Sequence, residues 1–285
     1  MSILSTHTPR KRFSPIGKFA LVGIIFFLAL IFLAPFFIPY APDSMDLENT
    51  FAPMSFAHWL GTDHLGRDIA TRLLYGGRIS LSAGFLILSL ILFLGISIGG
   101  MCGFVGGKVD KVIMRICDIF LSLPTIVLSL FLVGILGSGL ENVILAIALT
   151  HWAWYARIVR SIVLHLKSKE FVLLSPTFGL SNYQSFKQNM FVPVISQCLV
   201  LATMDIGHIV LHIAGLSFLG LGVQPPNAEW GVMLSDCKDY LWSNPELVLY
   251  PGGALFITIA LFNLLGDSLR DYFDTDLSSI HKGVE

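Results

Sequence analysis

Six apolar stretches, each long enough to cross a lipid bilayer, constrain this chain more than any other feature of its sequence. They lie near residues 19–38, 81–104, 116–136, 140–159, 194–222 and 248–266. A helix of about 20 apolar residues matches the hydrocarbon thickness of a bilayer. Backbone polar groups in hydrocarbon must be hydrogen-bonded within their own segment, so we expect each stretch to be a helix. The sequence therefore predicts an all-α membrane protein with six transmembrane helices.

The composition excludes a soluble globular protein. Of the 285 residues, 54% are hydrophobic and only 13% are charged, whereas about a quarter of the residues in ordinary soluble domains are charged. The formal net charge is -1, so no overall field favours a nucleic acid or an acidic ligand. The first stretch follows basic residues, as in a signal peptide. Its length, and the lack of a small-residue cleavage site after it, favour a spanning helix instead.

The distribution of positive charge predicts the orientation in the membrane. If the N-terminus is cytoplasmic, the inner segments hold 14 of the 18 Lys and Arg residues. Short cytoplasmic segments retain Lys and Arg during insertion, so we expect both termini in the cytoplasm. Three connections are then too long to be simple turns, and loops of such length commonly carry function. They are residues 39–78 outside, 160–192 inside and 223–246 outside.

The polar residues of the fifth stretch are the most distinctive chemical feature. Asp205, His208 and His212 fall at positions i, i+3 and i+7. At about 100° per residue they occupy an arc of roughly 60° on a helix. An ionisable group at membrane depth costs about 2.5–3.5 kcal/mol on insertion scales, so such groups face a bundle interior or a water-filled cavity. We expect all three side chains to point away from lipid.

No sequence motif indicates catalysis or a resident cofactor. The chain has no GxxxxGK[ST] nucleotide-binding loop. Its four cysteines do not show the CxxC spacing of a zinc or redox site. We therefore expect no catalytic residue, no cofactor and no resident metal.

Four blocks of sequence occur in order along the chain and resemble one family of transport proteins. They read HWLGTDHLGRD at residues 58–68, DIFLSLP at 118–124, LSFLGLGVQPP at 216–226 and FNLLGDSLRD at 262–271. All four resemble the second permease subunit of the dipeptide, oligopeptide and nickel ABC importers. HWAWYAR at 151–157 and LATMDIGH at 201–208 are more similar to the nickel type than to the peptide type. The resemblance implies a permease for nickel, carried as a small chelate. Dipeptides, oligopeptides or a metallophore are the alternative cargo.

The resemblance also implies an architecture and a set of partners. The fold would be that of a type I ABC importer permease, located in the bacterial inner membrane. Its parts would be a cytoplasmic segment (1–18), a first transmembrane helix (19–38), an external loop (39–78), a permease core (79–272) and a cytoplasmic tail (273–285). Such chains form a heterodimer with a second permease subunit and work with two cytoplasmic ATPase subunits and an extracytoplasmic solute-binding protein. This chain would then be a non-catalytic subunit that forms half of the pathway.

In that family, the cytoplasmic loop after the fourth helix carries a short coupling helix that contacts the ATPase. Here the resemblance implies this contact in residues 160–192. The coupling segment would begin near Glu170, turn at Gly179 and run towards Pro193.

This segment departs from the family pattern, because LLS at residues 173–175 replaces Glu-Ala-Ala. A proline is tolerated best in the first turn of a helix. The sequence therefore predicts that the coupling helix starts late, at Pro176, with Ser175 as its cap.

The face that carries Asp205, His208 and His212 is interpreted as a lining of the translocation pathway. Imidazole suits nickel, but tight ligation would trap an ion that must leave, so transient contact is expected. The alternative is a helix-packing network in which Asp205 caps or pairs with a partner helix.

Other polar and aromatic residues are expected to be structural. Four charges of the outer loop can pair with each other at helical spacing: Asp63, Arg67, Asp68 and Arg72. At the inner membrane interface, we expect Asp118 to pair with Arg115. Trp152, Trp154 and Tyr155 would anchor the same interface as an aromatic belt.

Two other classes of function remain open. His208 and His212 form a His-x-x-x-His pair, which is compatible with a metal on a helix, so an intramembrane metalloenzyme is one alternative. A self-sufficient ion-coupled carrier is the other. Metal analysis of the purified protein tests the first, and transport by this chain alone in vesicles tests the second.

Overall fold

The computed structural model describes residues 13–281, most of which are helical. Within these residues, five helices are long and apolar enough to span a membrane, and a bent pair of helices can form a sixth span. The spanning elements are α1 (Pro15–Leu33), α2 (Ile69–Val105), the pair α3 (Gly107–Leu121) and α4 (Thr125–Leu136), α5 (Leu140–Lys167), α8 (Phe191–Phe218) and α10 (Glu246–His281). The predicted all-α membrane fold is confirmed.

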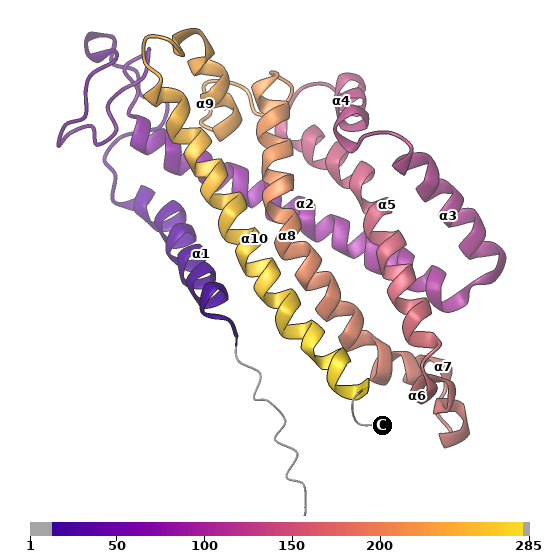
Figure 1. The fold of residues 1–285 in the computed structure, drawn as a ribbon. Coiled ribbons are helices and arrows are strands. Elements are labelled where there is room, and N and C mark those ends of the chain that lie inside the picture. The colour runs from indigo at the N-terminus through magenta and orange to yellow at the C-terminus, as the bar shows by residue number, and fades with distance from the viewer. Residues whose placement is uncertain (1–12, 282–285) are drawn as a thin grey trace, which may run out of the picture.

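Short elements lie at the two ends of this bundle. One end carries η1 (Ala34–Phe36), η2 (Leu47–Asn49), α9 (Trp230–Cys237) and η5 (Lys238–Tyr240). The other carries α6 (Glu170–Leu173), η3 (Ser175–Phe178), α7 (Asn182–Ser185) and the π-helical η4 (Phe186–Met190). Figure 1 shows α9 at one end of the long helices, and α6 and α7 at the opposite end. The segments expected outside and inside the membrane therefore lie at opposite ends of the molecule.

The third apolar stretch is not one straight helix. α3 and α4 meet at an angle of 87°, and Pro124 is the N-cap of α4. Proline has no N–H and disfavours a helical conformation in the residue before it, so α3 ends before this residue. The expectation of a single helix over 116–136 is wrong in this respect, although the pair can still form one span.

Close packing of α2 against α5 forms the middle of the bundle. Gly95, Gly99 and Gly103 recur every four residues on α2. A Cβ on Gly99 would lie only 2.3 Å from the carbonyl oxygen of Ala156 on α5. Small residues at this spacing let the backbones of two membrane helices approach closely. A larger residue at Gly99 would force the two helices apart.

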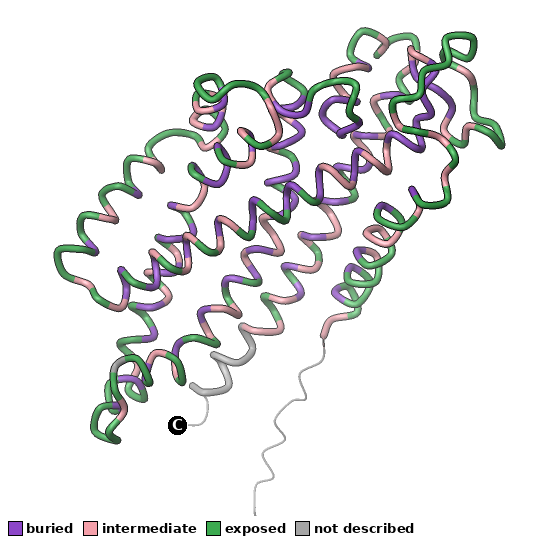
Figure 2. Tube along the Cα trace, turned by 180° about the vertical axis from the view of Figure 1, so that it is seen from behind, coloured by how far each residue is buried: buried purple, intermediate pink, exposed green. Residues whose placement is uncertain are grey.

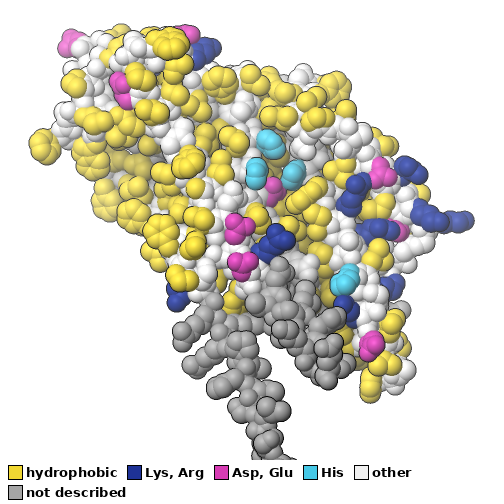
Figure 3. Space-filling view, viewed as in Figure 1, with side chains coloured by type: hydrophobic (Ala, Val, Ile, Leu, Met, Phe, Trp, Pro, Cys, Tyr) yellow, Lys and Arg dark blue, Asp and Glu magenta, His cyan; other side chains and the backbone are white. Residues whose placement is uncertain are grey.

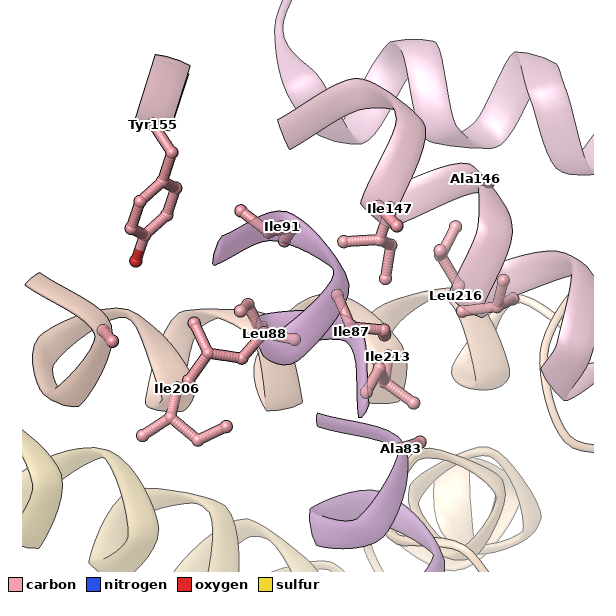
Figure 4. Packing of buried hydrophobic residues seen from close by; sticks show 14 of the residues in the cluster. Ala83, Ile87, Leu88, Ile91, Ala146, Ile147, Tyr155, Ile206, Ile213 and Leu216 are labelled. Atoms are coloured by element: carbon pink, nitrogen blue, oxygen red, sulfur yellow. The ribbon is translucent and has the colours of Figure 1, made fainter. Parts of the chain in front are cut away.

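The largest apolar cluster lies where α2, α5 and α8 meet. Ile87, Ile147, Ile206 and Ile213 are at most 1% exposed, and Figure 4 shows them in the same packed region as Tyr155. Figure 2 shows buried and exposed residues alternating along the long helices. Each helix thus packs on one side and leaves an apolar side open, as expected of a chain surrounded by hydrocarbon.

Candidate functional site

A polar cluster lies between α5 and α8 in an otherwise apolar part of the bundle. Asp205 Oδ2 of α8 lies 3.0 Å from His151 Nε2 and accepts a hydrogen bond from the Tyr155 hydroxyl at 3.2 Å. Both partners belong to α5, so the carboxylate joins two helices. The side chains of His151 and Asp205 are 16% and 12% exposed, and Tyr155 is fully buried.

His208 and His212 continue this cluster along α8. His208 is exposed and His212 is half-buried. His151, Asp205 and His208 all lie close enough to His212 to interact with it electrostatically. Figure 3 shows three histidines grouped beside one acidic side chain in the middle of a largely apolar face. Within residues 13–281, no three metal-binding side chains converge in a geometry that could hold a metal ion.

The three residues predicted for the pathway are therefore neighbours with different surroundings. Asp205 contacts two residues of α5. Such contacts are expected if Asp205 belongs to a helix-packing network, which is the alternative to a role in the pathway. His208 and His212 remain at least partly accessible.

Two members of the cluster were not predicted from the sequence. His151 had a signal, since it is an imidazole inside an apolar stretch. Tyr155 was expected to be an interface anchor, and this expectation is wrong. Its ring is fully buried and its hydroxyl bonds Asp205 on the neighbouring helix.

A second network, made of charged side chains, lies at the end of the bundle that carries α9. Arg67 Nε lies 2.7 Å from Asp63 Oδ2, and Arg67 Nη2 lies 2.9 Å from Asp236 Oδ2. Arg72 Nη2 lies 3.4 Å from the same oxygen of Asp236. The side chains of both arginines are only 2% exposed. These pairs connect the segment before α2 and the start of α2 to α9. We call these four residues the outer network.

The expected pairing among the outer charges is only partly confirmed. Both arginines pair with Asp63, but residues 63–68 precede α2 rather than forming one of its turns. Asp68 instead pairs with His58 at 2.9 Å and accepts the backbone N–H of Thr71, which makes it the N-cap of α2.

Glu229 is the most completely buried acid next to this network. It is 0% exposed. Its carboxylate accepts hydrogen bonds from the Ser80 hydroxyl at 2.7 Å and from the backbone N–H of Gly231 and Val232. Burial raises the pKa of Glu229 above its usual value, although these hydrogen bonds act in the opposite direction. The residue caps α9 and fixes it against α2.

The opposite end of the bundle carries the segment between α5 and α8. Glu170 begins α6, and Gly179 follows η3 with a φ of 77°, a left-handed conformation that favours glycine. Pro193 lies near the start of α8, which directly continues the π-helical η4. Several large apolar side chains here are more than half exposed: Phe171, Leu173, Leu174, Phe178 and Tyr183.

Two local expectations for the predicted cytoplasmic side are wrong. Pro176 does not begin a capped α-helix, because it lies inside the four-residue η3, and Ser175 donates its hydroxyl to the Phe171 carbonyl instead of capping. Asp118 pairs with Arg157 of α5 rather than with Arg115. This contact ties α3 to α5, which the spacing along α3 alone did not reveal.

Residues 95–279 match the model of the family described as binding-protein-dependent transport system inner membrane component. The chain is 51% identical to the nickel transport system permease protein NikC of Escherichia coli, over 90% of this chain and 94% of the relative. It is 38% identical to the dipeptide transport system permease protein DppC of Alkalihalophilus pseudofirmus, over 92% and 88%. It is also 38% identical to the metal-staphylopine import system permease protein CntC of Staphylococcus aureus, over 92% and 91%.

Proposed function

Because this chain belongs to the family of binding-protein-dependent transport system inner membrane components, we propose that it is a permease subunit that forms half of a nickel pathway in an ATP-driven importer. The observation that supports nickel as the substrate is the 51% identity to a nickel permease over 90% of this chain. The identity to the dipeptide and metal-staphylopine permeases is 38%. Peptides and metallophore complexes are the second candidate cargo, on the strength of those two similarities.

The energy for transport comes from other subunits in this proposal. The sequence has no nucleotide-binding loop of the GxxxxGK[ST] type. The exposed apolar side chains between α5 and α8, among them Phe178 at 80% exposure, suit a protein partner that covers them. We assign this contact to two ATPase subunits and place Glu170, Gly179 and Pro193 along it. The cargo arrives from a solute-binding protein on the other side.

The orientation follows from the charge distribution. With 14 of the 18 Lys and Arg residues on one side, both termini and the coupling segment are cytoplasmic. The outer network and α9 then face the solute-binding protein. The boundaries 1–18, 19–38, 39–78, 79–272 and 273–285 complete the proposed organisation.

The pathway runs along the face of α8 that carries Asp205, His208 and His212. Imidazole nitrogen is a good ligand for nickel, and conduction needs binding weak enough for the ion to leave. Two partly accessible imidazoles without a third converging ligand among the described residues meet both conditions. The second permease chain would close the open side of this face.

The proposal is tested by uptake of radiolabelled nickel and of a labelled dipeptide by cells with and without this gene. We expect a loss of nickel uptake with dipeptide uptake unchanged. A peptide defect with normal nickel uptake would overturn the substrate assignment. Transport by this chain alone in vesicles would overturn the ATP-driven mechanism.

A further inference from the structure

A cavity of about 370 Å³ lies at the end of the bundle that carries α9. Its walls come from the segment between residues 51 and 62, from Ile69 at the start of α2, and from residues 244–250 around the start of α10. Figure 1 shows these three parts at the same end of the molecule. Ligand cavities in proteins enclose about 300–1,000 Å³, so this one is large enough to receive a group from a partner. We call it the outer cavity.

The outer cavity combines an apolar lining with one exposed carboxylate. Phe51, Leu60 and Leu247 contribute to the apolar part. Glu246 also lines the cavity and is exposed. Among the described residues, its side chain has a single hydrogen-bond partner, the Asn244 amide, which lies 3.4 Å from Oε1. A carboxylate can accept several hydrogen bonds, so Glu246 retains acceptor capacity for a group that enters the cavity.

The wall formed by residues 51 and 52 is fixed before any partner arrives. Phe51 has a φ of 52°, which is unfavourable for a bulky side chain. Such a conformation persists only where the surrounding structure holds it. Here the Phe51 N–H donates to the Asp63 carbonyl at 3.1 Å, and the Ala52 N–H donates to Thr62 Oγ1 at 2.8 Å. A preformed wall reduces the ordering cost of binding.

The surface around the outer cavity is acidic. The two outer segments, residues 39–78 and 223–246, expose five acidic side chains: Asp43, Asp46, Glu48, Asp239 and Glu246. They expose one basic side chain, Lys238, because Arg67 and Arg72 are buried in the outer network and Arg78 is half-buried. Interacting protein surfaces carry complementary potentials. This end of the chain therefore suits a partner with a basic surface.

We infer that the outer cavity receives an arginine or lysine side chain of the solute-binding protein. This inference rests on the proposed function and specifies the chemistry of its outer contact. Both side chains carry an apolar stem and a charged head. The stem packs against Phe51, Leu60 and Leu247, and the head reaches Glu246. A purely apolar side chain would cover the carboxylate without pairing it, which is unfavourable, and an acidic side chain would be repelled.

The inference is tested by the affinity of the purified solute-binding protein of the same importer for the assembled transporter. Glu246→Gln keeps the shape of the side chain and removes its charge. We expect roughly 30-fold weaker binding, the lower end of the loss when one member of an interfacial charge pair is removed. Ala52→Leu changes no charge but adds a larger side chain to the cavity lining, and it should weaken binding as well. Thermal unfolding in detergent checks that both variants are folded.

Asp239→Asn is the matched control, because it removes an exposed acid of the same surface that does not line the cavity. It should bind the solute-binding protein nearly as the wild type does. Each Lys and Arg of the solute-binding protein is then replaced by Gln in turn. One of these changes should cost no further affinity when combined with Glu246→Gln, as expected of two residues in contact. Wild-type affinity in Glu246→Gln, an equal loss in Asp239→Asn, or the absence of such a coupled residue would overturn the inference.

Nickel uptake by the wild type separates this inference from the proposed function. If the wild type imports nickel but the affinity for the solute-binding protein does not depend on Glu246, the inference alone fails. If the affinity depends on Glu246 but the wild type imports no nickel, the proposed cargo fails and the contact in the outer cavity stands.

Discussion

The outer network and the polar cluster of α5 and α8 both bury ionisable groups, but they differ in how completely these groups are paired. In the outer network, Arg67 and Arg72 are 2% exposed and face Asp63 and Asp236. In the polar cluster, Asp205 is paired, whereas one ring nitrogen of His151 has no hydrogen-bond partner among residues 13–281.

We interpret this difference as one of role: the outer network stabilises the fold, and the polar cluster lines the proposed pathway. A buried charge is stable only when it is paired and hydrogen-bonded, so the outer network can do little except hold the segment before α2 against α9. Polar groups left partly free at membrane depth are costly, and they mark pathways for ions or substrates. We therefore expect changes in the outer network to lower the amount of folded protein, and changes in the polar cluster to lower transport.

The largest effect should come from Arg67→Ala. It leaves Asp63 and Asp236 without one of their partners, and breaking a buried ion pair in this way costs about 3–5 kcal/mol. We expect a strong loss of the chain from the membrane, measured by quantitative immunoblotting and by thermal unfolding in detergent. Lys238→Ala, which removes an exposed charge of the same region, should leave both unchanged. Normal abundance of Arg67→Ala would show that the outer network is not needed to stabilise the folded chain.

The next effect concerns exposed aromatic residues at the two ends. Phe178 is 80% exposed at the proposed ATPase contact, and Trp242 is 96% exposed at the opposite end. Truncation of an aromatic hot spot costs about 2 kcal/mol in binding, which corresponds to roughly 30-fold in affinity. We expect Phe178→Ala to weaken ATPase binding to the purified permease pair by this factor and Trp242→Ala to leave it intact. Equal losses in the two variants would contradict the assignment of the coupling end.

A smaller effect is expected from the double variant His208→Ala and His212→Ala. These side chains are partly accessible and make no hydrogen bond that joins helices among the described contacts, so abundance should not change. Nickel uptake should fall roughly 10-fold, equivalent to about 1.4 kcal/mol. The control is His165→Ala, an exposed histidine near the C-terminal end of α5, which should transport normally.

The smallest effect is a pH dependence from Glu229. Burial raises its pKa in the folded state above the ordinary value of 4.5, so the folded chain binds the proton more tightly than the unfolded chain does. The contribution of Glu229 to stability is therefore fully present below pH of about 4.5 and decreases as the pH rises through the raised pKa. Glu229→Gln should remove this part of the slope, measured as thermal unfolding in detergent between pH 4 and 8. An unchanged slope would show that the buried carboxyl does not titrate in this range.

Much of the fold could be predicted from the sequence, because spanning length and backbone hydrogen bonding leave helices as the main solution. The bend at Pro124 was missed, since periodicity and apolarity continue across it. The role of Gly99 was missed for another reason. A close approach to Ala156 depends on which helices are neighbours, and spacing within one helix does not reveal that.

For the candidate site too, the sequence predicts which residues share one helix but not which helices are neighbours. Asp205, His208 and His212 share one helix, so their common face follows from a period of 3.6 residues. His151 and Tyr155 come from α5, and only the packing of α5 against α8 brings them to Asp205. The partner of Asp118 was mistaken for the same reason, because Arg115 is near in sequence but Arg157 is near in space.

The most direct test of this division is nickel uptake per molecule of chain in the membrane, measured side by side for Arg67→Ala and for the double variant of His208 and His212. We expect a reduced amount of Arg67→Ala with near-normal uptake per molecule. For the histidine variant we expect a normal amount, with uptake per molecule reduced roughly 10-fold. Full uptake per molecule in the histidine variant would show that His208 and His212 do not serve transport.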